Sequence, residues 1–379
     1  MILYGKVLCV IDHFGSGGAQ RQMVELACGL QRRGHQVQAF LYYPDQTFFR
    51  HRLDESGIIV HAMSKGRGFS LNVLASLRRL IDSERFDAVV SFLDRPNVYA
   101  ELAWWWSSVR PRLVVSERSH HRHDATTPGA RLRRQLHRCA HAVVANSRTH
   151  AQWLEAQPAL AGHAHCIYNG LDLSRFGSAP NVPKRARDLQ LLAIGRIGAE
   201  KNALTLVQAL ALHHDRHGWV PQLDWVGRRD ESPSGQRYWQ QLEAALHACQ
   251  PVADRWRWLG ERDDVPALLA SHHALVHASF YEGLPNVVCE ALASARPVIA
   301  SAVCDHPLLV QPPSRGRLFD PADAGSLLAA LESLHGLDEA TWTAMGRAAR
   351  AFAAEALAAD RMVREYESLM GLGNGRVEP

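Results

Sequence analysis

The sequence predicts an α/β protein with two doubly wound parallel sheets. Short apolar runs rich in β-branched residues alternate along the chain with longer amphipathic segments, which is typical of strands alternating with helices. The alternation stops in a loop-like stretch after residue 170 and starts again near residue 189. A chain of 379 residues is also long enough for two domains of ordinary size. We therefore expect two Rossmann-like domains that face a cleft, with ligands at the carboxyl ends of the strands.

Six apolar runs mark the strands expected in a first domain over residues 1–180. The segment after the first run has apolar residues at a spacing of about 3.6 and a stop at Gly34, which predicts an amphipathic helix. The six runs are VLCVID, QAFLYY, IIVHAM, AVVSFL, RLVVSE and AVVANS.

A second domain is expected over residues 181–345. The stretch LDLSRFGSAPNVPKRARD before it carries two prolines and predicts a linker. A final helical segment within residues 346–379 is expected to cross back toward the first domain and to end in a polar tail. The strand-like runs are LQLLAIG, QLDWVG, WRWLG, ALVHAS, PVIAS and RLF, and helices are expected to begin near Asn202, Gln236, Val265 and Asn286.

The composition excludes several classes of protein. Apolar residues make up 47% of the chain and charged residues 21%, as in globular rather than disordered proteins. No run of about 18 apolar residues is present, so no membrane-spanning helix is expected. The first residues, MILYGKVLCVID, lack the layout of a signal peptide, and seven cysteines without a C-x-x-C pair suit reduced thiols. These features predict a cytoplasmic protein.

The net charge of +4 is unevenly distributed. Residues 1–180 hold 22 Lys and Arg against 14 Asp and Glu, a net +8, whereas the remainder holds 20 against 24, a net −4. A basic half-chain indicates an anionic partner. Trp104, Trp105 and Trp106, together with the basic run at residues 131–138, favour a lipid headgroup surface over a nucleic acid.

The first strand is followed by a glycine-rich loop, IDHFGSGGAQR, at residues 11–21. Gly17 and Gly18 stand between strand and helix, where the backbone could approach a ligand closely. A dinucleotide fingerprint would need a further glycine where Gln20 stands, so the loop does not favour NAD. A tight turn without a ligand is the alternative interpretation.

The stretch AIGRIGAEKNALTLVQAL, residues 193–210, places two cations around the start of a predicted helix. Arg196 follows Gly195 after a strand, and Lys201 precedes the helix. Two cations and a helix N-terminus together suit a diphosphate. Only four lysines stand against 38 arginines, so a lysine here is less expected as an ordinary surface charge. A solvated charge at the helix start remains the alternative.

Two glutamates, Glu282 and Glu290, surround a Gly-Leu-Pro-Asn turn in EGLPNVVCEALA. Pro285 suits the first turn of a helix, and Asn286 and Glu290 are four apart and share a face. Gly283 in the loop leaves backbone amides free for a phosphate, while carboxylates accept hydrogen bonds from neutral hydroxyls. The arrangement predicts recognition of a nucleotide sugar, and carboxylates that only cap the helix are the alternative.

These stretches resemble the retaining glycosyltransferases of family GT4, group 1 enzymes of bacterial surface-polysaccharide type with the two-domain GT-B fold. The resemblance covers nearly the whole chain. It is carried in the family's order by GSGGAQR, YNGLDLSRF, GRIGAEKN and EGLPNVVCEALA, the last with the family's E-x7-E spacing.

The resemblance implies a donor site mainly in the second domain and an acceptor site mainly in the first. Arg196 and Lys201 would stabilise the leaving diphosphate, Glu290 would bind the ribose and Glu282 a donor-sugar hydroxyl. It also implies retention of the anomeric configuration without a covalent enzyme intermediate. The other positions expected at the donor site are Gly17, Gly18, Gly195, Gly283, Leu284, Pro285 and Asn286.

One loop departs from the family pattern. Where the family often has two glycines followed by a glutamate, this chain reads SAVCDHPLLV at residues 301–310. The Cys304-Asp305 pair replaces the glycines, and Leu308 or Leu309 stands where an acid is common. The departure leaves open which donor-sugar contacts this loop makes.

The candidate catalytic histidine is His120, in VVSERSHHRHD at the end of a predicted strand. Members of the family often present a functional histidine from this region. An ordinary surface histidine and a metal site in this histidine cluster are the alternatives. No D-x-D sequence occurs, which agrees with a reaction that needs no metal and no cofactor beyond the nucleotide-sugar substrate.

A basic face is expected on the helix predicted at residues 129–144. Arg131, Arg134 and Arg138 recur at i, i+3 and i+7, and Leu132, Leu136 and Cys139 form the opposite, apolar face. Such a face can dock on acidic lipid, with about 1 kcal/mol per basic residue. A solvated helix face is the alternative.

The sequence thus predicts a glycosyltransferase that moves a sugar, from a UDP-sugar, to a lipid-linked oligosaccharide or polysaccharide. Its expected place is the cytoplasm, peripheral on the inner face of the membrane, without a nucleic-acid partner. A nucleotide-sugar epimerase on a similar fold and a non-catalytic nucleotide-sugar-binding subunit are the alternatives.

Overall fold

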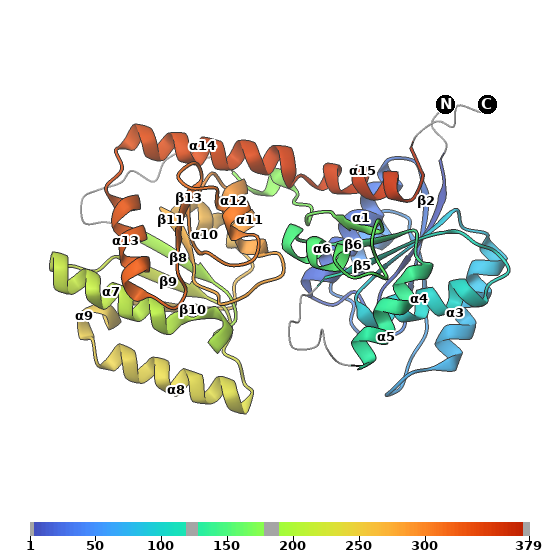
Figure 1. Cartoon of the computed structure of the whole chain (residues 1–379), viewed down its shortest axis with the longest axis horizontal. Coiled ribbons are helices and arrows are strands. Elements are labelled where there is room, and N and C mark those ends of the chain that lie inside the picture. The colour runs from blue at the N-terminus through green and yellow to red at the C-terminus, as the bar shows by residue number, and fades with distance from the viewer. Residues whose placement is uncertain (1–3, 119–127, 178–188, 374–379) are drawn as a thin grey trace. The chain divides into compact units, whose positions relative to one another are not determined.

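The computed structural model describes residues 4–118, 128–177 and 189–373 (Figure 1). The chain divides into two compact units, Met1–Gly170 with Ala358–Pro379, and Leu171–Leu357. The chain therefore passes from one unit to the other twice, after Gly170 and after Leu357. The sequence placed these changes about ten residues away, at 180 and 345.

Unit 1 contains a seven-stranded sheet in the order β3-β2-β1-β4-β5-β6-β7, and all of its strand pairs are parallel. Its strands are β1 (Lys6–Val10), β2 (Gln36–Leu41), β3 (Ile59–Ala62), β4 (Ala88–Phe92), β5 (Arg112–Glu117), β6 (Ala142–Ala145) and β7 (Ala164–Cys166). Its helices are α1 (Gly18–Arg32), α2 (Arg50–Glu55), α3 (Leu71–Glu84), α4 (Asp94–Trp106), α5 (Pro128–Leu136), η2 (His137–Cys139), α6 (Arg148–Glu155) and α15 (Ala359–Leu369).

Helices cover both faces of this sheet. Successive residues of β4 enter different apolar clusters: Val89 joins the cluster with α3 and α4, and Val90 the cluster with α1 and α15. Because neighbouring side chains of a strand point to opposite faces, a strand buried on both faces is apolar over most of its length, as β4 is apart from Ser91. This explains why the strands of the sequence read as continuous apolar runs.

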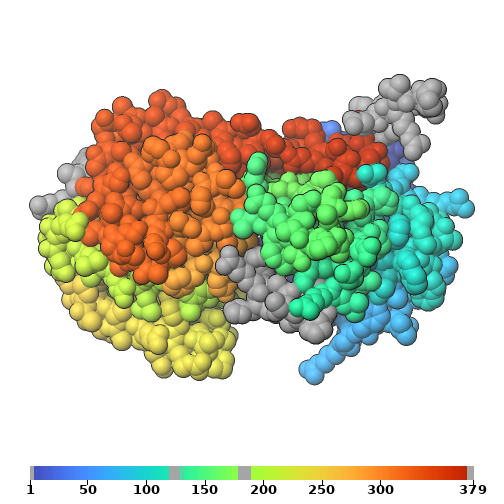
Figure 2. All heavy atoms as spheres, viewed as in Figure 1, coloured from blue at the N-terminus to red at the C-terminus, as the bar shows by residue number. Residues whose placement is uncertain are grey.

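The helix α15 completes one face of unit 1. Tyr366, fully buried, joins the cluster of α1, and Glu367 accepts hydrogen bonds from Arg33 (3.0 Å) and His35 (2.7 Å). Gly29 of α1 is needed for this approach, since a Cβ there would lie 2.4 Å from Val363. In the space-filling view the outer surface of α15, coloured red, is open to solvent on unit 1 (Figure 2).

Unit 2 contains a six-stranded sheet in the order β10-β9-β8-β11-β12-β13, also parallel throughout. Its strands are β8 (Gln190–Ile194), β9 (Gln222–Val226), β10 (Trp256–Gly260), β11 (Ala274–His277), β12 (Val298–Ser301) and β13 (Gly316–Phe319). Its helices are η3 (Leu173–Arg175), η4 (Ala199–Lys201), α7 (Ala203–His217), α8 (Pro233–His247), α9 (Gln250–Ala253), α10 (Val265–Ser271), α11 (Asn286–Ala293), α12 (His306–Val310), α13 (Ala324–His335) and α14 (Glu339–Ala356).

The helices of unit 2 begin close to the predicted positions. α10 and α11 begin at Val265 and Asn286, as expected, and α7 begins one residue after Asn202. α8 begins at Pro233 rather than near Gln236, because Ser232 caps it by accepting a hydrogen bond from the backbone of Gly235. The two parallel sheets confirm the predicted fold class.

Candidate active site

The carboxyl ends of β8 and β11 define the candidate site in unit 2. The two strands are neighbours in the sheet, and the strand order reverses direction between them. Open parallel sheets bind their ligands at such a reversal, outside the carboxyl ends of the strands. The loops at residues 195–202 and 278–285 meet there, since Phe280 donates a backbone hydrogen bond to Glu200 (2.9 Å).

The first of these loops is held in place at Asn202, the residue after Lys201. Asn202 has a left-handed backbone (φ 57°), and its amide donates to the carbonyls of Ala278 (3.1 Å) and Pro321 (2.8 Å). The stem of Lys201 runs beside Gly195, where a Cβ would lie 3.1 Å from Cε of the lysine. The glycine therefore leaves space for the lysine side chain.

Lys201 forms an ion pair with Glu282 of the second loop. The same carboxylate oxygen, Oε1, accepts hydrogen bonds from Ser279 Oγ (2.7 Å) and His277 Nε2 (3.0 Å). Burial acts to raise the pKa of Glu282, but the hydrogen bond from His277 and the charges of His277 and Lys201 outweigh it and hold the pKa well below its usual range. Glu282 is therefore an ionised acceptor at neutral pH.

Arg196 has different partners. Its guanidinium lies 2.7 Å from Glu200 and 3.8 Å from Asp230, and its side chain is half exposed. The hydrogen bond with Glu200 raises the pKa of Arg196 above its usual value. The two predicted cations thus belong to the same loop, and each of them faces a carboxylate.

The helix α11 begins beside Glu282. Pro285 is its N-cap residue and has no side-chain acceptor for the first backbone N–H groups, so the start of the helix keeps its positive field. Glu290 lies in the second turn and is buried, as is Leu284. Gly195, Arg196, Lys201, Glu282, Gly283, Leu284, Pro285, Asn286 and Glu290 therefore all belong to one edge of the unit 2 sheet.

The loop that departs from the family pattern also reaches Glu282. The backbone N–H of Glu282 lies 3.4 Å from the sulfur of Cys304, which has a left-handed backbone (φ 48°). Asp305 is fully buried at the N-cap of α12. The thiol of Cys304 therefore lies next to Glu282 in the candidate site.

Gly17 and Gly18 lie in unit 1 and not among these residues. Gly17 is the N-cap residue of α1, which begins at Gly18. A Cβ at Gly17 would lie 2.0 Å from the side-chain oxygen of Gln20, whose amide donates to Asp12 (3.0 Å). A larger residue at this position would therefore displace the side chain of Gln20 from its hydrogen bond with Asp12.

His120 lies outside the described residues, but the strand before it ends in a polar network that the sequence did not reveal. Glu117, the last residue of β5, accepts hydrogen bonds from His137 (3.0 Å) and His150 (2.9 Å). The other nitrogen of His137 contacts Glu101. These residues come from separate segments of ordinary composition, so no local pattern could have indicated that they meet.

The predicted basic face of α5 and η2 is divided. Arg131 and Arg138 are exposed, whereas the guanidinium of Arg134 lies over the ring of Trp153, 5.2 Å from its centroid. Leu132, expected on the apolar face, is 64% exposed. On α4, Trp105 and Trp106 are exposed, but Trp104 is half-buried and donates to the carbonyl of Pro111 (2.7 Å).

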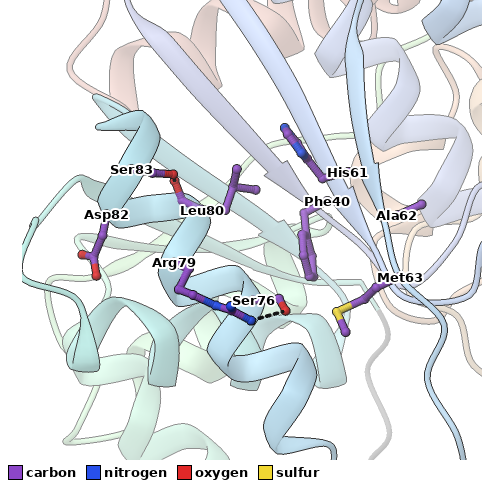
Figure 3. A pocket seen from close by; sticks show the side chains of 9 residues that line it. All are labelled: Phe40, His61, Ala62, Met63, Ser76, Arg79, Leu80, Asp82 and Ser83. Carbon is purple, nitrogen blue, oxygen red and sulfur yellow. Dashed lines mark hydrogen bonds between the residues drawn. The ribbon is translucent and has the colours of Figure 1, made fainter.

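A pocket of about 730 Å³ lies elsewhere in unit 1, between α3, the edge strand β3 and its neighbour β2 (Figure 3). Phe40, His61 and Arg79 are among the residues that line it. None of its lining residues is a predicted site residue, and it lies in the other unit from the Lys201–Glu282 pair. The size of the pocket alone is therefore no evidence that it binds the sugar nucleotide.

Clustered metal ligands and membrane-spanning helices are both absent from the described part of the chain. Within residues 4–118, 128–177 and 189–373, no three His, Cys, Asp or Glu side chains are grouped as a metal site. Over the same ranges, no helix combines the length and apolar character needed to cross a bilayer.

Solved structures of the same fold are glycosyltransferases of the GT-B class. The structure of Anabaena Alr3699/HepE in complex with UDP has a TM-score of 0.81 with this chain at 19% identity, covering 97% of this chain and 100% of that one. The structure of WaaG, a glycosyltransferase involved in lipopolysaccharide biosynthesis, has a TM-score of 0.68 at 15% identity, covering 96% and 99%.

Two family models match the chain, glycosyl transferases group 1 over residues 188–336 and glycosyltransferase family 4 over residues 16–175. Together the two matches span most of both units. The chain belongs to the group 1, family 4 glycosyltransferases.

Two curated relatives are bacterial enzymes. The UDP-Gal:alpha-D-GlcNAc-diphosphoundecaprenol alpha-1,3-galactosyltransferase of Escherichia coli is 27% identical over 174 residues, which are 44% of this chain and 43% of that enzyme. The GalNAc-alpha-(1->4)-GalNAc-alpha-(1->3)-diNAcBac-PP-undecaprenol alpha-1,4-N-acetyl-D-galactosaminyltransferase of Campylobacter jejuni is 25% identical over 295 residues, 76% of each chain.

Proposed function

We propose that this glycosyltransferase moves a sugar from a UDP-sugar to a lipid-linked oligosaccharide or polysaccharide acceptor, with retention of configuration and without a metal ion. The names of both curated relatives describe transfer to an undecaprenol-linked sugar, and one of them names a UDP-sugar donor. The Anabaena protein binds UDP and UDP-glucose in its solved structures. These likenesses support the choice of donor and acceptor classes.

The observation that carries the proposal is the ion pair of Lys201 and Glu282 at the reversal point of the unit 2 sheet. A diphosphate needs cations and backbone amides, and Lys201, Arg196 and the start of α11 supply both. A sugar needs a hydroxyl acceptor, and Glu282 supplies an ionised one beside the cation. In this proposal Glu290 binds the ribose.

In the proposed reaction, the bond between the anomeric carbon and the diphosphate breaks, and the acceptor oxygen bonds to that carbon on the same face. The proton of the acceptor hydroxyl passes to the departing diphosphate, so charges and atoms balance. Negative charge develops on the leaving diphosphate, where the fixed cations of Arg196 and Lys201 act most strongly. Their positive charge is the reason that the proposal requires no metal.

The proposed acceptor side is unit 1, peripheral on the cytoplasmic membrane face. Unit 1 holds 24 Lys and Arg against 17 Asp and Glu, a net +7, and unit 2 holds 18 against 21, a net −3. Exposed Trp105 and Trp106 add the amphipathic rings that favour a membrane interface. His120 remains the proposed histidine of the acceptor side.

The test is a transfer assay with purified full-length protein, a panel of nucleotide sugars and an undecaprenyl-diphosphate-linked oligosaccharide, in the presence and absence of EDTA. We expect one UDP-sugar to support glycosylation that EDTA leaves unchanged, and NMR of the product to show the anomeric configuration of the donor. Transfer from a different nucleotide class, an inverted product or loss of activity with EDTA would each overturn the corresponding part of the proposal.

A further inference from the structure

We propose that His277 is the positioning residue of Glu282: it holds one carboxylate oxygen in place so that the other oxygen faces the donor sugar. This inference rests on the proposed function, in which Glu282 accepts a hydrogen bond from a donor-sugar hydroxyl. It adds to that function a residue that no sequence motif indicated.

The contacts of Glu282 are strongly one-sided. Its Oε1 atom accepts from Lys201, Ser279 and His277, whereas no described residue donates a hydrogen bond to its Oε2 atom. The side chain is 14% exposed, so the carboxylate is not hidden from a ligand. A carboxylate held in this way has one oxygen occupied by protein and one available to a hydroxyl.

The orientation of the His277 ring follows from its neighbours. An ionised carboxylate can only accept, so Nε2 of His277 must carry the proton that is donated to Glu282. Behind it, the ring of His306 meets the ring of His277 edge-on, with 5.2 Å between centroids. His277 is 3% exposed and His306 is fully buried, so the two rings have little space in which to turn.

The carboxyl ends of β11 and β12 hold the rings of His277 and His306 in position. His277 is the last residue of β11, and Ser301 is the last residue of β12. Ser301 Oγ donates to the carbonyl of Ser279 (2.6 Å), and Nδ1 of His306 lies 2.7 Å from the carbonyl of Ser301. The position of His277 is therefore set by two neighbouring strands of the sheet rather than by a loop alone.

Lys201 cannot play the same part during turnover. Its ammonium group sits at the end of a long flexible side chain, and in the proposed function this group binds the diphosphate. When the ammonium group turns toward a phosphate, Glu282 loses one of its three donors. His277 and Ser279 remain, and of these two only His277 can also carry a positive charge.

The titratable groups of the described chain around Glu282 are Lys201 from η4, His277 from β11, His306 from α12 and the thiol of Cys304 against its backbone N–H. Burial and the neighbouring His277 lower the pKa of His306 to about 3, so His306 is neutral and does not compete for the carboxylate. The hydrogen bond from His277 comes first among the causes that lower the pKa of Glu282, and burial acts against it. Without His277, burial should raise that pKa above its depressed value.

The test compares His277→Leu, His277→Gln and His272→Leu in the full-length protein. Gln keeps a neutral donor at nearly the same reach, and Leu keeps only the volume. His272 is the matched control, since it is also buried and also hydrogen-bonded to a carboxylate, Asp224 at 3.1 Å, but it precedes the opposite end of β11. Calorimetry with UDP and with the UDP-sugar, and kcat/KM as a function of pH, are the readouts.

We expect His277→Leu to bind UDP nearly normally but to bind the UDP-sugar about ten- to hundredfold more weakly, the effect of losing a hydrogen bond to a charged group. The acid limb of its kcat/KM profile should lie at higher pH than that of wild type, because the ionised form of Glu282 loses a stabilising hydrogen bond. His277→Gln should recover most of the UDP-sugar affinity, and His272→Leu should leave both readouts unchanged.

The inference would be overturned if His277→Leu had the same ratio of UDP-sugar affinity to UDP affinity as wild type, and the same acid limb of kcat/KM. It would also be overturned if His277→Gln were as impaired as His277→Leu. If His277→Leu does not fold, the pH profile of His277→Gln decides the matter: Gln cannot carry the positive charge that helps to keep Glu282 ionised, so an acid limb unmoved from that of wild type would contradict the inference. Absence of transfer by wild-type protein with every UDP-sugar would instead overturn the proposed function, so the two failures can be told apart.

Discussion

Lys201 and Arg196 stand five residues apart in one loop, yet each has its own carboxylate partner. Lys201 pairs with Glu282, which is nearly buried, and Arg196 with Glu200, where the guanidinium is half exposed. Exposed ion pairs contribute little free energy, whereas a buried charge that loses its partner is costly. The two cations should therefore differ in how strongly the site depends on them.

Lys201→Ala and Arg196→Ala should both lower the rate of sugar transfer, by about 10²–10³-fold, as when one preorganised donor to developing charge is removed. Lys201→Ala should have the larger effect, because it also leaves Glu282 without its ammonium partner. Turnover assays with a saturating UDP-sugar measure both effects, with Arg216→Ala as a control on the surface of the same unit. Near-normal turnover in both variants would contradict the role in binding the diphosphate.

Glu290→Gln and Glu282→Gln should affect different ligands. Because the proposed partner of Glu290 is the ribose, Glu290→Gln should weaken UDP itself, by about ten- to hundredfold if a charge-assisted hydrogen bond is lost. Glu282→Gln should leave UDP binding close to normal and weaken only the UDP-sugar. Calorimetry with UDP alone separates the roles, and equal affinities of both variants for UDP would show that the division is wrong.

The residues of the candidate site could be predicted only as far as the local pattern reaches. The segment between β8 and α7 carries both cations and a glycine within a few positions, and the turn before α11 carries Glu282 and Gly283, so a local pattern could indicate both segments. The pairing of Lys201 with Glu282 joins residues 81 positions apart. His277 was missed for a related reason: at the end of an apolar strand it resembles any of the other 20 histidines.

At the scale of single elements, η2 and β5 are joined by a charged histidine. His137 is 2% exposed and lies between Glu101 and Glu117. Burial acts to lower the pKa of His137, but hydrogen bonds to the two carboxylates outweigh it and raise the pKa to about 10. The imidazolium therefore ties α4, β5 and η2 together at neutral pH.

A raised pKa in the folded state gives a definite pH dependence of stability. The contribution of His137 should be fully present below its ordinary pKa of 6.5 and should be lost as pH rises toward about 10. Thermal denaturation of wild type and His137→Gln at pH 6.5 and at pH 10 measures it. We expect the variant to be less stable at pH 6.5 and the difference to shrink at pH 10. An unchanged difference would mean that His137 acts through packing.

The elements show why some boundaries were predicted well and others were not. α8 begins at Pro233, directly after its capping residue Ser232, and this serine-proline pair is a local signal that could have placed the helix correctly. The break between α14 and α15 falls at Leu357 and Ala358, in a run of good helix formers with neither glycine nor proline nearby. Packing of α15 on unit 1 decides that break, and a local sequence pattern does not report on such packing.

For the whole molecule, the unequal charge of the two units predicts that the enzyme binds an anionic membrane surface through unit 1. Unit 1 should bind anionic vesicles, and the attraction should weaken as the screening length falls from about 10 Å at 0.1 M salt to about 3 Å at 1 M. Because Arg134 is packed over Trp153, the reversal to test is Arg131→Glu with Arg138→Glu. Sedimentation with phosphatidylglycerol vesicles should be lost in this variant while UDP binding persists.

The control for that experiment reverses two exposed arginines of unit 2, Arg216→Glu with Arg262→Glu, and changes the net charge by the same amount. We expect this control to sediment with vesicles as wild type does. Equal loss in both variants would indicate a general charge effect. If wild-type protein does not bind the vesicles at low salt, α5 is a solvated helix face.

The two passages of the chain between the units also set an order of assembly during synthesis. Unit 2 is one continuous segment and can fold as soon as it has left the ribosome, whereas about 190 residues of chain separate β7 from α15, which unit 1 needs. Until α15 arrives, the apolar residues of α1 that pack against Tyr366 and Val363 stay uncovered. The first half of the chain is thus the second to be finished, and a chain that ends at residue 357 should, once released from the ribosome, carry a protease-resistant unit 2 behind a protease-sensitive unit 1.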